Sequence, residues 1–205
     1  MNGRVSVSCH DVVEAARATQ LARPGLNARQ ARTVTSILDA GSAVLRAVGL
    51  DALTVRTVAL RAGVSPATAY TYFDSKDHLF AEMFWRHLCA HPSPALAGDD
   101  AVARLSELTK GLTSMLADCP EMAAAATRAL LGTDPAVERL RVRISGEYRT
   151  RFQGALGPTA DRNVLNALLL TFSGALLQTG MGLLTQDQLV ERLDRAFAVI
   201  MRTNA

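Results

Sequence analysis

The sequence predicts an all-α protein of about nine helices, on the basis of three observations. Hydrophobic residues make up 49% of the 205 residues and aromatic residues only 5%, with Ala and Leu abundant, a composition that favours helices over a β-sandwich. Apolar residues recur every three or four positions along most of the chain, which is the period of a helix. No segment alternates as a strand does, and no internal repeat is present.

Residues 1–26 are predicted to be a weakly structured N-terminal extension, which Pro24 and Gly25 separate from the first regular helix. Basic arms can reach a minor groove of DNA. The arginines of this segment are Arg4, Arg17 and Arg23. The acidic residues Asp11 and Glu14 reduce the positive charge of the segment, which argues against a role as such a basic arm.

The first helix is predicted to begin after Asn27, which can form a capping box with Gln30. It is predicted to end at Gly49, where a left-handed C-cap is favourable. Its apolar positions at helical spacing are Val34, Ile37, Leu38, Val44, Leu45 and Val48. This pattern gives one buried face.

Two short helices follow. Thr54 can cap the second helix, and Gly63 ends it. Ser65 can cap the third, with Pro66 at the first helical position, where the missing N–H costs nothing. Phe73 is the apolar end of the third helix, and we expect it in the core.

A fourth helix is predicted to begin at Asp74 or Ser75. The segment 91–98 after it contains Pro and Gly and is typical of a linker. We therefore expect a small helical domain at residues 27–91 and a larger helical domain at 99–205.

The larger domain is predicted to contain five helices. Their approximate spans are 101–117, 121–131, 134–156, 163–184 and 186–202. The segment 163–186 carries no charge over a length that could cross a bilayer. It also contains Asn163, Asn166 and Gln178, whose amides are costly in hydrocarbon. We expect a helix buried on most sides by protein, and no membrane span.

Residues Ala62–Ser65 join the second and third helices as the turn of a helix-turn-helix. The exposed face of the third helix would carry Pro66, Ala67, Thr68, Tyr70 and Thr71. Small residues let the backbone approach base edges, and methyl and hydroxyl groups can contact bases. Arg56 and Lys76 flank this uncharged face and can hold phosphates. The helix N-termini at Thr54 and Ser65 add N–H donors for phosphate oxygens.

The charge distribution agrees with an anionic partner without requiring one. The net charge is only +3. Between Arg23 and Lys76, however, seven basic residues face three acidic ones. A positive excess confined to one segment is the electrostatic footprint of nucleic acid, although an ordinary soluble surface can also carry an excess this small.

The segment "LTVRTVALRAGVSPATAYTYFDSKDHLF", Leu53 to Phe80, resembles the DNA-binding domain of TetR-type transcriptional regulators. The matching features are the Ala-Gly-Val-Ser turn, the Tyr-x-Tyr-Phe end of the third helix and the Ser-Lys-Asp-x-Leu opening of the fourth. The resemblance extends over about residues 30–84 and is specific because these features occur together at the right spacing. The rest of the chain matches only as a larger helical region.

The resemblance implies roles for individual residues. Those that would face bases are Arg56, Pro66, Ala67, Thr68 and Tyr70. Those that would face phosphates are Thr54, Thr71, Tyr72 and Lys76. Ala69 departs from the family, which usually has a larger aliphatic residue there, so the third helix would sit closer to the first or pack more loosely.

Some of these residues also have a structural interpretation. Tyr70 could mainly pack in a small aromatic core. Thr54 caps a helix with or without DNA. Lys76 at a helix start opposes the macrodipole, so the sequence offers little structural reason for it.

The family resemblance also implies a homodimer and a small-molecule effector. A dimer formed through the helices at 163–184 and 186–202 would read two half-sites of palindromic operator DNA about one turn apart. The alternative is that both are ordinary core helices. The middle helices would surround an apolar or amphipathic effector that releases a repressor from its operator. Candidate wall residues, each of which could instead be solid core, are Leu112, Met115, Leu116, Met122, Tyr148, Phe152 and Phe172.

Other function classes receive less support. No nucleophile motif, phosphate-binding glycine loop or useful pair of carboxylates appears, so we expect no enzyme and no cofactor. His87-x-Cys89-x-His91 places two histidines on one helix face, but two ligands are too few and we expect no metal. A helical adaptor or a metal-binding protein without operator DNA stays the alternative. Three cysteines without CxxC spacing and the lack of an apolar leader predict a cytoplasmic protein.

Overall fold

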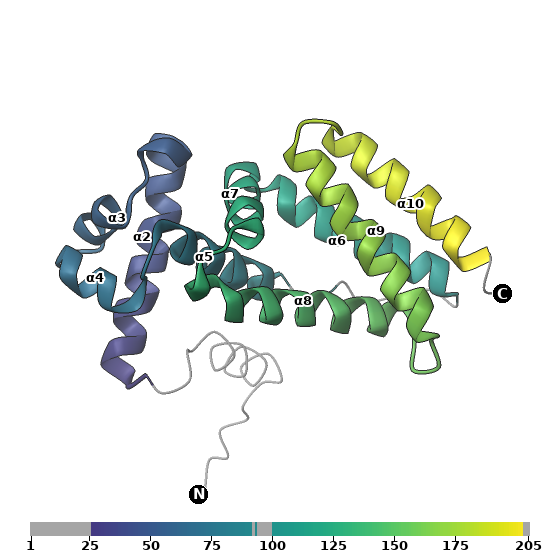
Figure 1. Cartoon of the computed structure of the whole chain (residues 1–205), viewed down its shortest axis with the longest axis horizontal. Coiled ribbons are helices and arrows are strands. Elements are labelled where there is room, and N and C mark those ends of the chain that lie inside the picture. The colour runs from purple at the N-terminus through teal and green to yellow at the C-terminus, as the bar shows by residue number, and fades with distance from the viewer. Residues whose placement is uncertain (1–25, 92, 94–99, 203–205) are drawn as a thin grey trace, which may run out of the picture.

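The computed structural model describes residues 26–91, 93 and 100–202, and the regular elements of this part are nine α-helices without strands (Figure 1). The helices are α2 (Ala28–Ala52), α3 (Val55–Arg61), α4 (Pro66–Tyr72), α5 (Lys76–Ala90), α6 (Ala101–Ala117), α7 (Pro120–Leu131), α8 (Pro135–Leu156), α9 (Arg162–Gly180) and α10 (Gln186–Arg202). The all-α prediction is confirmed. The expected N-terminal extension lies outside the described residues.

The first four helices begin where the sequence places their caps. The Asn27 side chain accepts a hydrogen bond from the Gln30 N–H at 3.0 Å, and the Asn27 N–H donates one to Gln30 Oε1 at 2.9 Å. Gly49 has a φ of 75°, a left-handed conformation that glycine adopts without strain, and it interrupts the helical geometry of α2. A last short turn then carries α2 on to Ala52.

α2, α3, α4 and the first half of α5 enclose one apolar cluster, the N-terminal core. Its most buried large side chains are Ile37, Leu53, Val58, Phe73, Leu79 and Phe80. Phe73 is fully buried, as expected, and holds the C-terminal end of α4 against the other helices. This core fixes the angle at which α4 is presented.

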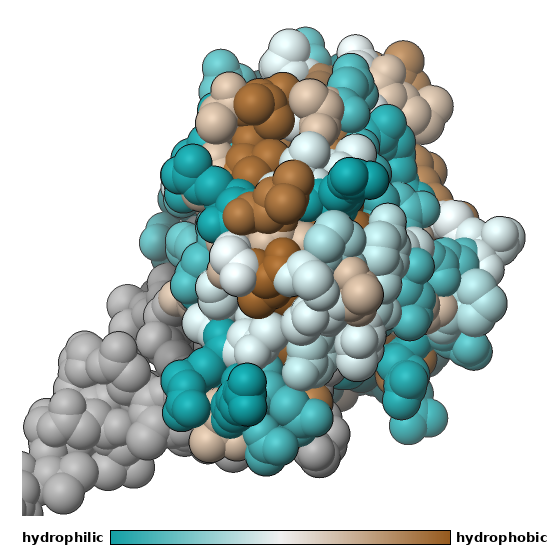
Figure 2. Space-filling model, turned by 90° about the vertical axis from the view of Figure 1, so that its left-hand side faces the viewer, coloured by the Kyte–Doolittle hydropathy of each residue, from teal (hydrophilic) through white to brown (hydrophobic). Residues whose placement is uncertain are grey.

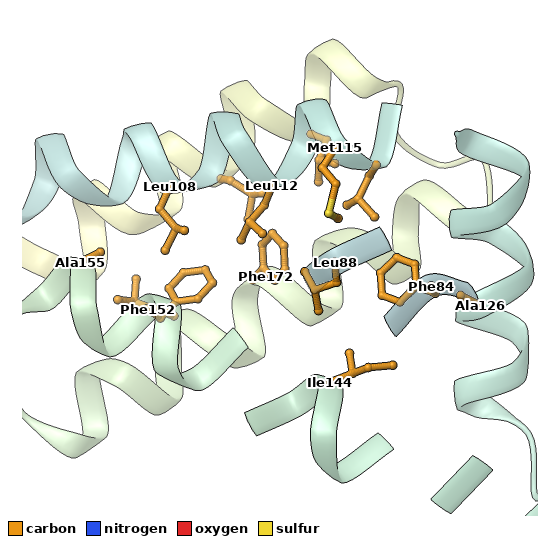
Figure 3. Close-up of a cluster of buried hydrophobic side chains, with 14 of the residues drawn as sticks. Phe84, Leu88, Leu108, Leu112, Met115, Ala126, Ile144, Phe152, Ala155 and Phe172 are labelled. Atoms are coloured by element: carbon orange, nitrogen blue, oxygen red, sulfur yellow. The ribbon is translucent and has the colours of Figure 1, made fainter. Parts of the chain in front are cut away.

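The second half of α5 packs with α6, α7, α8, α9 and α10 around a separate cluster, the C-terminal core (Figures 1 and 3). Figure 3 shows Leu108, Leu112 and Met115 of α6 projecting toward Phe152 and Phe172. α5 contributes to both cores, because its early residues lie in the first and its later residues in the second. α5 therefore connects the two groups of helices, and α7 does the same with Met122 in the first core and Ala126 in the second.

α9 is less buried than the sequence analysis expected. Only Val164, Leu165, Leu168 and Phe172 are buried in it, whereas Leu170 is 75% exposed and Leu177 is 38% exposed. The expectation that segment 163–186 is buried on most sides is therefore wrong for a single chain. One helix contacts neighbours along only part of its circumference, and the remaining apolar face stays open.

A different helix meets the length and composition criteria for a membrane span. Within the described residues this is α2, where the qualifying window is 39% buried. Its apolar face, with Ile37 and Leu45, lies in the N-terminal core. That is how the core helix of a folded domain passes the same test.

Candidate nucleic-acid interface

The helix-turn-helix is built by short-range hydrogen bonds. Thr54 accepts from the Thr57 N–H at 3.0 Å, and Thr57 Oγ1 accepts from the Thr54 N–H at 2.9 Å. Gly63 adopts a φ of 70° in the turn, which only glycine reaches without strain. Ser65 Oγ then accepts from the Thr68 N–H at 3.0 Å and caps α4.

α4 has one buried side and one open side. Ala69 and Phe73 are fully buried and seat the helix on the N-terminal core. The predicted contact residues divide by exposure: Thr54, Arg56, Ser65, Ala67, Tyr70 and Thr71 are exposed, and Pro66, Thr68, Tyr72 and Lys76 are half-buried. Because Tyr70 is 51% exposed, it does not serve mainly as a core residue.

The surface formed by α2, α3 and α4 has the polarity expected of this motif. Figure 2 looks onto these helices: pale, weakly polar side chains occupy the middle of the face, and strongly hydrophilic ones lie around them. Several apolar side chains lie among them. The exposed large apolar residues of these helices are Val48, Leu60 and Tyr70. Leu60, which is exposed on α3 between Arg56 and Arg61, was not among the residues predicted for this surface.

Lys76 has a structural partner that the sequence analysis did not foresee. Its Nζ donates a hydrogen bond to the Leu50 carbonyl at 2.8 Å and lies 5.6 Å from the centre of the Phe80 ring. The break at Gly49 leaves the carbonyl groups of the last turn of α2 in need of donors. Lys76 therefore ties α2 to α5 at the edge of the candidate interface.

Two hydrogen bonds connect α5 to α8. The Ser75 hydroxyl, which caps α5, donates to Asp134, which caps α8. This bond, helped by the Ala136 N–H, lowers the pKa of the Asp134 carboxyl below its ordinary value. At the other end, buried Arg151 donates to the Leu88 carbonyl at 2.7 Å. These bonds fasten α8 to α5, the helix that follows the helix-turn-helix.

Most of the predicted effector-wall residues lie together. Leu112, Met115, Leu116, Phe152 and Phe172 are buried in the C-terminal core, and Tyr148 packs against it. Met122 does not join them. It lies in the N-terminal core with Ala125, because the start of α7 packs toward α2 and α5.

The histidine pair near the end of α5 is engaged in local contacts. His87 Nε2 lies 3.0 Å from the Met115 carbonyl, and His91 Nδ1 lies 2.8 Å from the His87 carbonyl. Burial lowers the pKa of His87, so its imidazole stays neutral to a lower pH than an exposed histidine would. Across the described ranges, no three His, Cys, Asp or Glu side chains come together as a metal site would require.

Comparisons with known proteins agree with this geometry. Residues 37–83 match the model of bacterial regulatory proteins of the TetR family. An uncharacterized HTH-type transcriptional regulator of Mycobacterium tuberculosis is 41% identical over 177 residues, which cover 85% of this chain and 83% of the relative. The HTH-type transcriptional repressor KstR of Mycolicibacterium smegmatis is 34% identical over 102 residues, 48% of this chain and 50% of KstR.

Solved structures share the fold. A TetR transcriptional regulator from Rhodococcus sp. RHA1 has a TM-score of 0.68 at 19% identity, covering 82% of this chain and 96% of that one. Thermus thermophilus FadR, a TetR-family repressor in complex with lauroyl-CoA, has a TM-score of 0.58 at 19% identity over 82% and 93%. The multidrug binding protein EbrR has a TM-score of 0.54 at 22% identity over 80% and 93%.

The family model covers the helix-turn-helix itself, and the mycobacterial relative extends the match over most of the chain. In helix-turn-helix proteins the second helix of the motif lies in the major groove of DNA. This chain therefore belongs to the TetR family of bacterial DNA-binding transcriptional regulators, which is not a family of enzymes.

Proposed function

We propose that the protein binds double-stranded operator DNA through the open side of α4, and the observation that carries this is the lack of charge on that side between two flanking cations. Arg56 is exposed on α3, and Lys76 begins α5. In this arrangement the residues that meet bases are Arg56, Pro66, Ala67, Thr68 and Tyr70. Thr54, Thr71, Tyr72 and Lys76, with the N–H groups that follow Ser65, meet phosphates.

The chain divides in the same way. Residues 27–91 act as the DNA-binding part, and residues 99–205 act as the dimerisation and effector-binding part. Support comes from the two apolar cores: residues 34–83 supply most of the first, which α7 completes with Met122 and Ala125, and the second consists mainly of residues after Phe84. A bacterial regulator of this kind works in the cytoplasm, where its operator lies.

The test is a pair of substitutions on the recognition surface. An operator is first isolated by retaining genomic fragments on the purified protein, and its affinity is measured by fluorescence anisotropy. Arg56→Ala and Tyr70→Ala should each weaken binding by about 1–3 kcal/mol. Arg139→Ala removes the same charge from an exposed position on α8 and should leave the affinity unchanged.

Salt gives a second readout of the same surface. Binding by the unsubstituted protein should fall steeply as salt rises, because phosphate contacts release counterions. Arg56→Ala should make that dependence shallower if Arg56 also neutralises a phosphate. Normal affinity in both surface variants would reject the proposed surface, and retention of no genomic fragment would favour a protein partner for the helix-turn-helix.

The proposed functional unit is a homodimer that buries α9 and α10 against their copies. Its support is the open apolar face described above. Exposed apolar residues of α9, α10 and the turn between them are Leu170, Leu177, Met181, Leu183 and Val199. An exposed set of this kind marks an interaction surface, and a symmetric dimer places two copies of α4 at successive half-sites.

Leu170→Glu tests the dimer. A carboxylate at the centre of an apolar interface is costly to bury, so sedimentation should show a monomer that no longer binds the operator. Val142→Glu places the same charge on α8, where Val142 is 70% exposed, and should stay dimeric. A dimeric Leu170→Glu protein would move the interface elsewhere.

The proposed regulation is repression relieved by an apolar or amphipathic small molecule bound in the C-terminal core. Supporting observations are the apolar character of that core, the repressor KstR among the relatives and, among proteins of the same fold, FadR with lauroyl-CoA and the multidrug binding protein EbrR. Such a ligand would favour the state in which the two copies of α4 no longer fit the operator.

A further inference from the structure

The C-terminal half of the molecule contains buried polar atoms that nothing satisfies. Within the part of the chain that the structure describes, three buried side-chain atoms have no hydrogen-bond partner: Trp85 Nε1, the Tyr148 hydroxyl and Asp194 Oδ1. Trp85 lies in the C-terminal core and Tyr148 packs against it. Folded proteins leave few such atoms, because each has lost its water without replacement. Each one therefore requires an explanation.

The Tyr148 ring packs among aromatic side chains, and its buried hydroxyl has no hydrogen-bond partner. The Tyr148 ring meets the Phe172 ring edge-on, with 5.2 Å between their centres, and Phe172 lies 5.4 Å from Phe152. Burial raises the pKa of Tyr148 far above its usual range, so the phenol is neutral and keeps its proton to donate. Phenylalanine would provide the same ring contacts without an unsatisfied hydroxyl. Packing therefore explains the ring of Tyr148 and leaves the hydroxyl unexplained.

The nearby cations are already engaged. Arg151, one turn from Tyr148 on α8, pairs with Glu147 at 2.7 Å and donates to the Leu88 carbonyl. Arg143 stacks over the Trp85 ring, 4.4 Å from its centre. A ligand carboxylate entering this core would need a cation as its partner. A neutral oxygen needs only a donor, which Tyr148 supplies.

We propose that Tyr148 recognises the effector by donating a hydrogen bond to a neutral carbonyl or hydroxyl oxygen on an otherwise apolar molecule. The effector class is a hydrocarbon skeleton, ring or chain, with one such oxygen at its buried end. The ring faces of Phe152 and Phe172 contact the apolar body. This inference rests on the proposed effector-responsive function and specifies what that site selects.

Tyr148→Phe tests the inference, since it removes the hydroxyl and keeps the ring. The probes are 1-tetralone with tetralin and 2-octanone with octane, pairs that differ by one carbonyl oxygen. Trp85 is the only tryptophan of the chain and lies in the same core, so its fluorescence reports binding to the full-length protein. The substitution should weaken ketone binding about three- to tenfold and leave hydrocarbon binding unchanged.

Thr109→Val is the matched control. Thr109 is fully buried in the same half of the molecule, but its hydroxyl already donates to the Leu105 carbonyl at 2.8 Å. Its loss should not change the ratio of ketone to hydrocarbon affinity. The ligand-free Tyr148→Phe protein should melt at the same temperature as the unsubstituted protein or above it, because an unsatisfied group has been removed.

The binding and melting measurements decide the inference. Equal loss of ketone and hydrocarbon affinity in Tyr148→Phe, a lower melting temperature of that variant without ligand, or no binding of any probe overturns the inference. Ketone binding that depends on Tyr148 supports it. Operator anisotropy separates it from the proposed function: ketone binding without operator release leaves the recognition standing and removes the regulatory role. A compound that releases the operator equally from the unsubstituted protein and from Tyr148→Phe would support the regulatory role and remove the recognition by Tyr148.

Discussion

The two apolar cores of this chain differ in whether the buried polar side-chain atoms beside them have hydrogen-bond partners. Around the N-terminal core, Asn27, Thr54, Ser65 and Ser75 cap α2 to α5 with their own side chains. The unpaired buried atoms found in the described residues all lie on helices of the C-terminal core, and α9 beside it leaves Leu170 exposed. Among the described residues, the N-terminal core therefore leaves no buried side-chain polar atom without a hydrogen-bond partner. The unpaired buried atoms and the exposed apolar face of the C-terminal half agree with the proposals that a ligand and a second chain bind there.

Truncating one phenylalanine in each core should break this comparison most strongly. Phe73→Ala and Phe152→Ala each remove a fully buried ring and should cost about 3–5 kcal/mol of unfolding free energy. Only Phe73 supports α4, so Phe73→Ala should also abolish operator binding under conditions where the protein is still folded. Denaturant unfolding and operator anisotropy at low temperature measure the two effects.

Phe152→Ala is the control for that experiment, because it opens a cavity of similar size on the other side of α5. It should retain most operator affinity. If both variants lost operator binding equally while folded, the two cores would have to be regarded as one cooperative unit.

Local patterns explain what the sequence could predict. The caps at Asn27, Thr54 and Ser65 bond to residues three positions away, and such spacing is visible in a sequence. The helix-turn-helix and the exposed position of Tyr70 follow from the same short-range periodicity. For this reason the helices of the described residues and the exposure of one side of α4 could be predicted.

Long-range contacts explain what it could not. Lys76 bonds to a carbonyl 26 residues earlier, and Ser75 bonds to Asp134, 59 residues later. Met122 lies in the N-terminal core because α7 packs back toward α2. The exposed face of α9 depends on how many neighbours surround it, which hydrophobic periodicity alone does not specify.

The bond between Ser75 and Asp134 should couple the two halves by a measurable amount. Ser75→Ala and Asp134→Ala each also remove a cap, so neither substitution alone isolates the bond. In a double-mutant cycle, the coupling energy should be about 0.5–3 kcal/mol. Denaturant unfolding of the four proteins measures it, and a coupling energy of zero would show that the two caps act independently.

Lys76→Met should have a smaller effect. It removes the hydrogen bond to the Leu50 carbonyl and keeps most of the aliphatic stem, so it should cost about 0.5–1.5 kcal/mol. Lys110→Met is the control, since Lys110 forms only an exposed ion pair with Glu107, and such pairs contribute little. Unfolding and operator anisotropy are compared for both variants. A loss of operator affinity in Lys76→Met with unchanged stability would assign Lys76 to phosphate alone.

The smallest expected effect is a pH dependence at Asp134. Its pKa in the folded protein is lowered, first by the Ser75 hydroxyl and then by the Ala136 N–H. The ionised form therefore stabilises the fold above the ordinary carboxyl value of 3.8, and this contribution is lost as pH falls through the lower folded pKa. Relative to Asp134→Asn, the unsubstituted protein should be more stable near pH 6 and lose that advantage toward pH 2. Asp100→Asn is the control, because Asp100 caps α6 by accepting from the Ala103 N–H of the same helix. The same pH dependence in that variant would mean that the effect belongs to helix caps in general and not to the contact between α5 and α8.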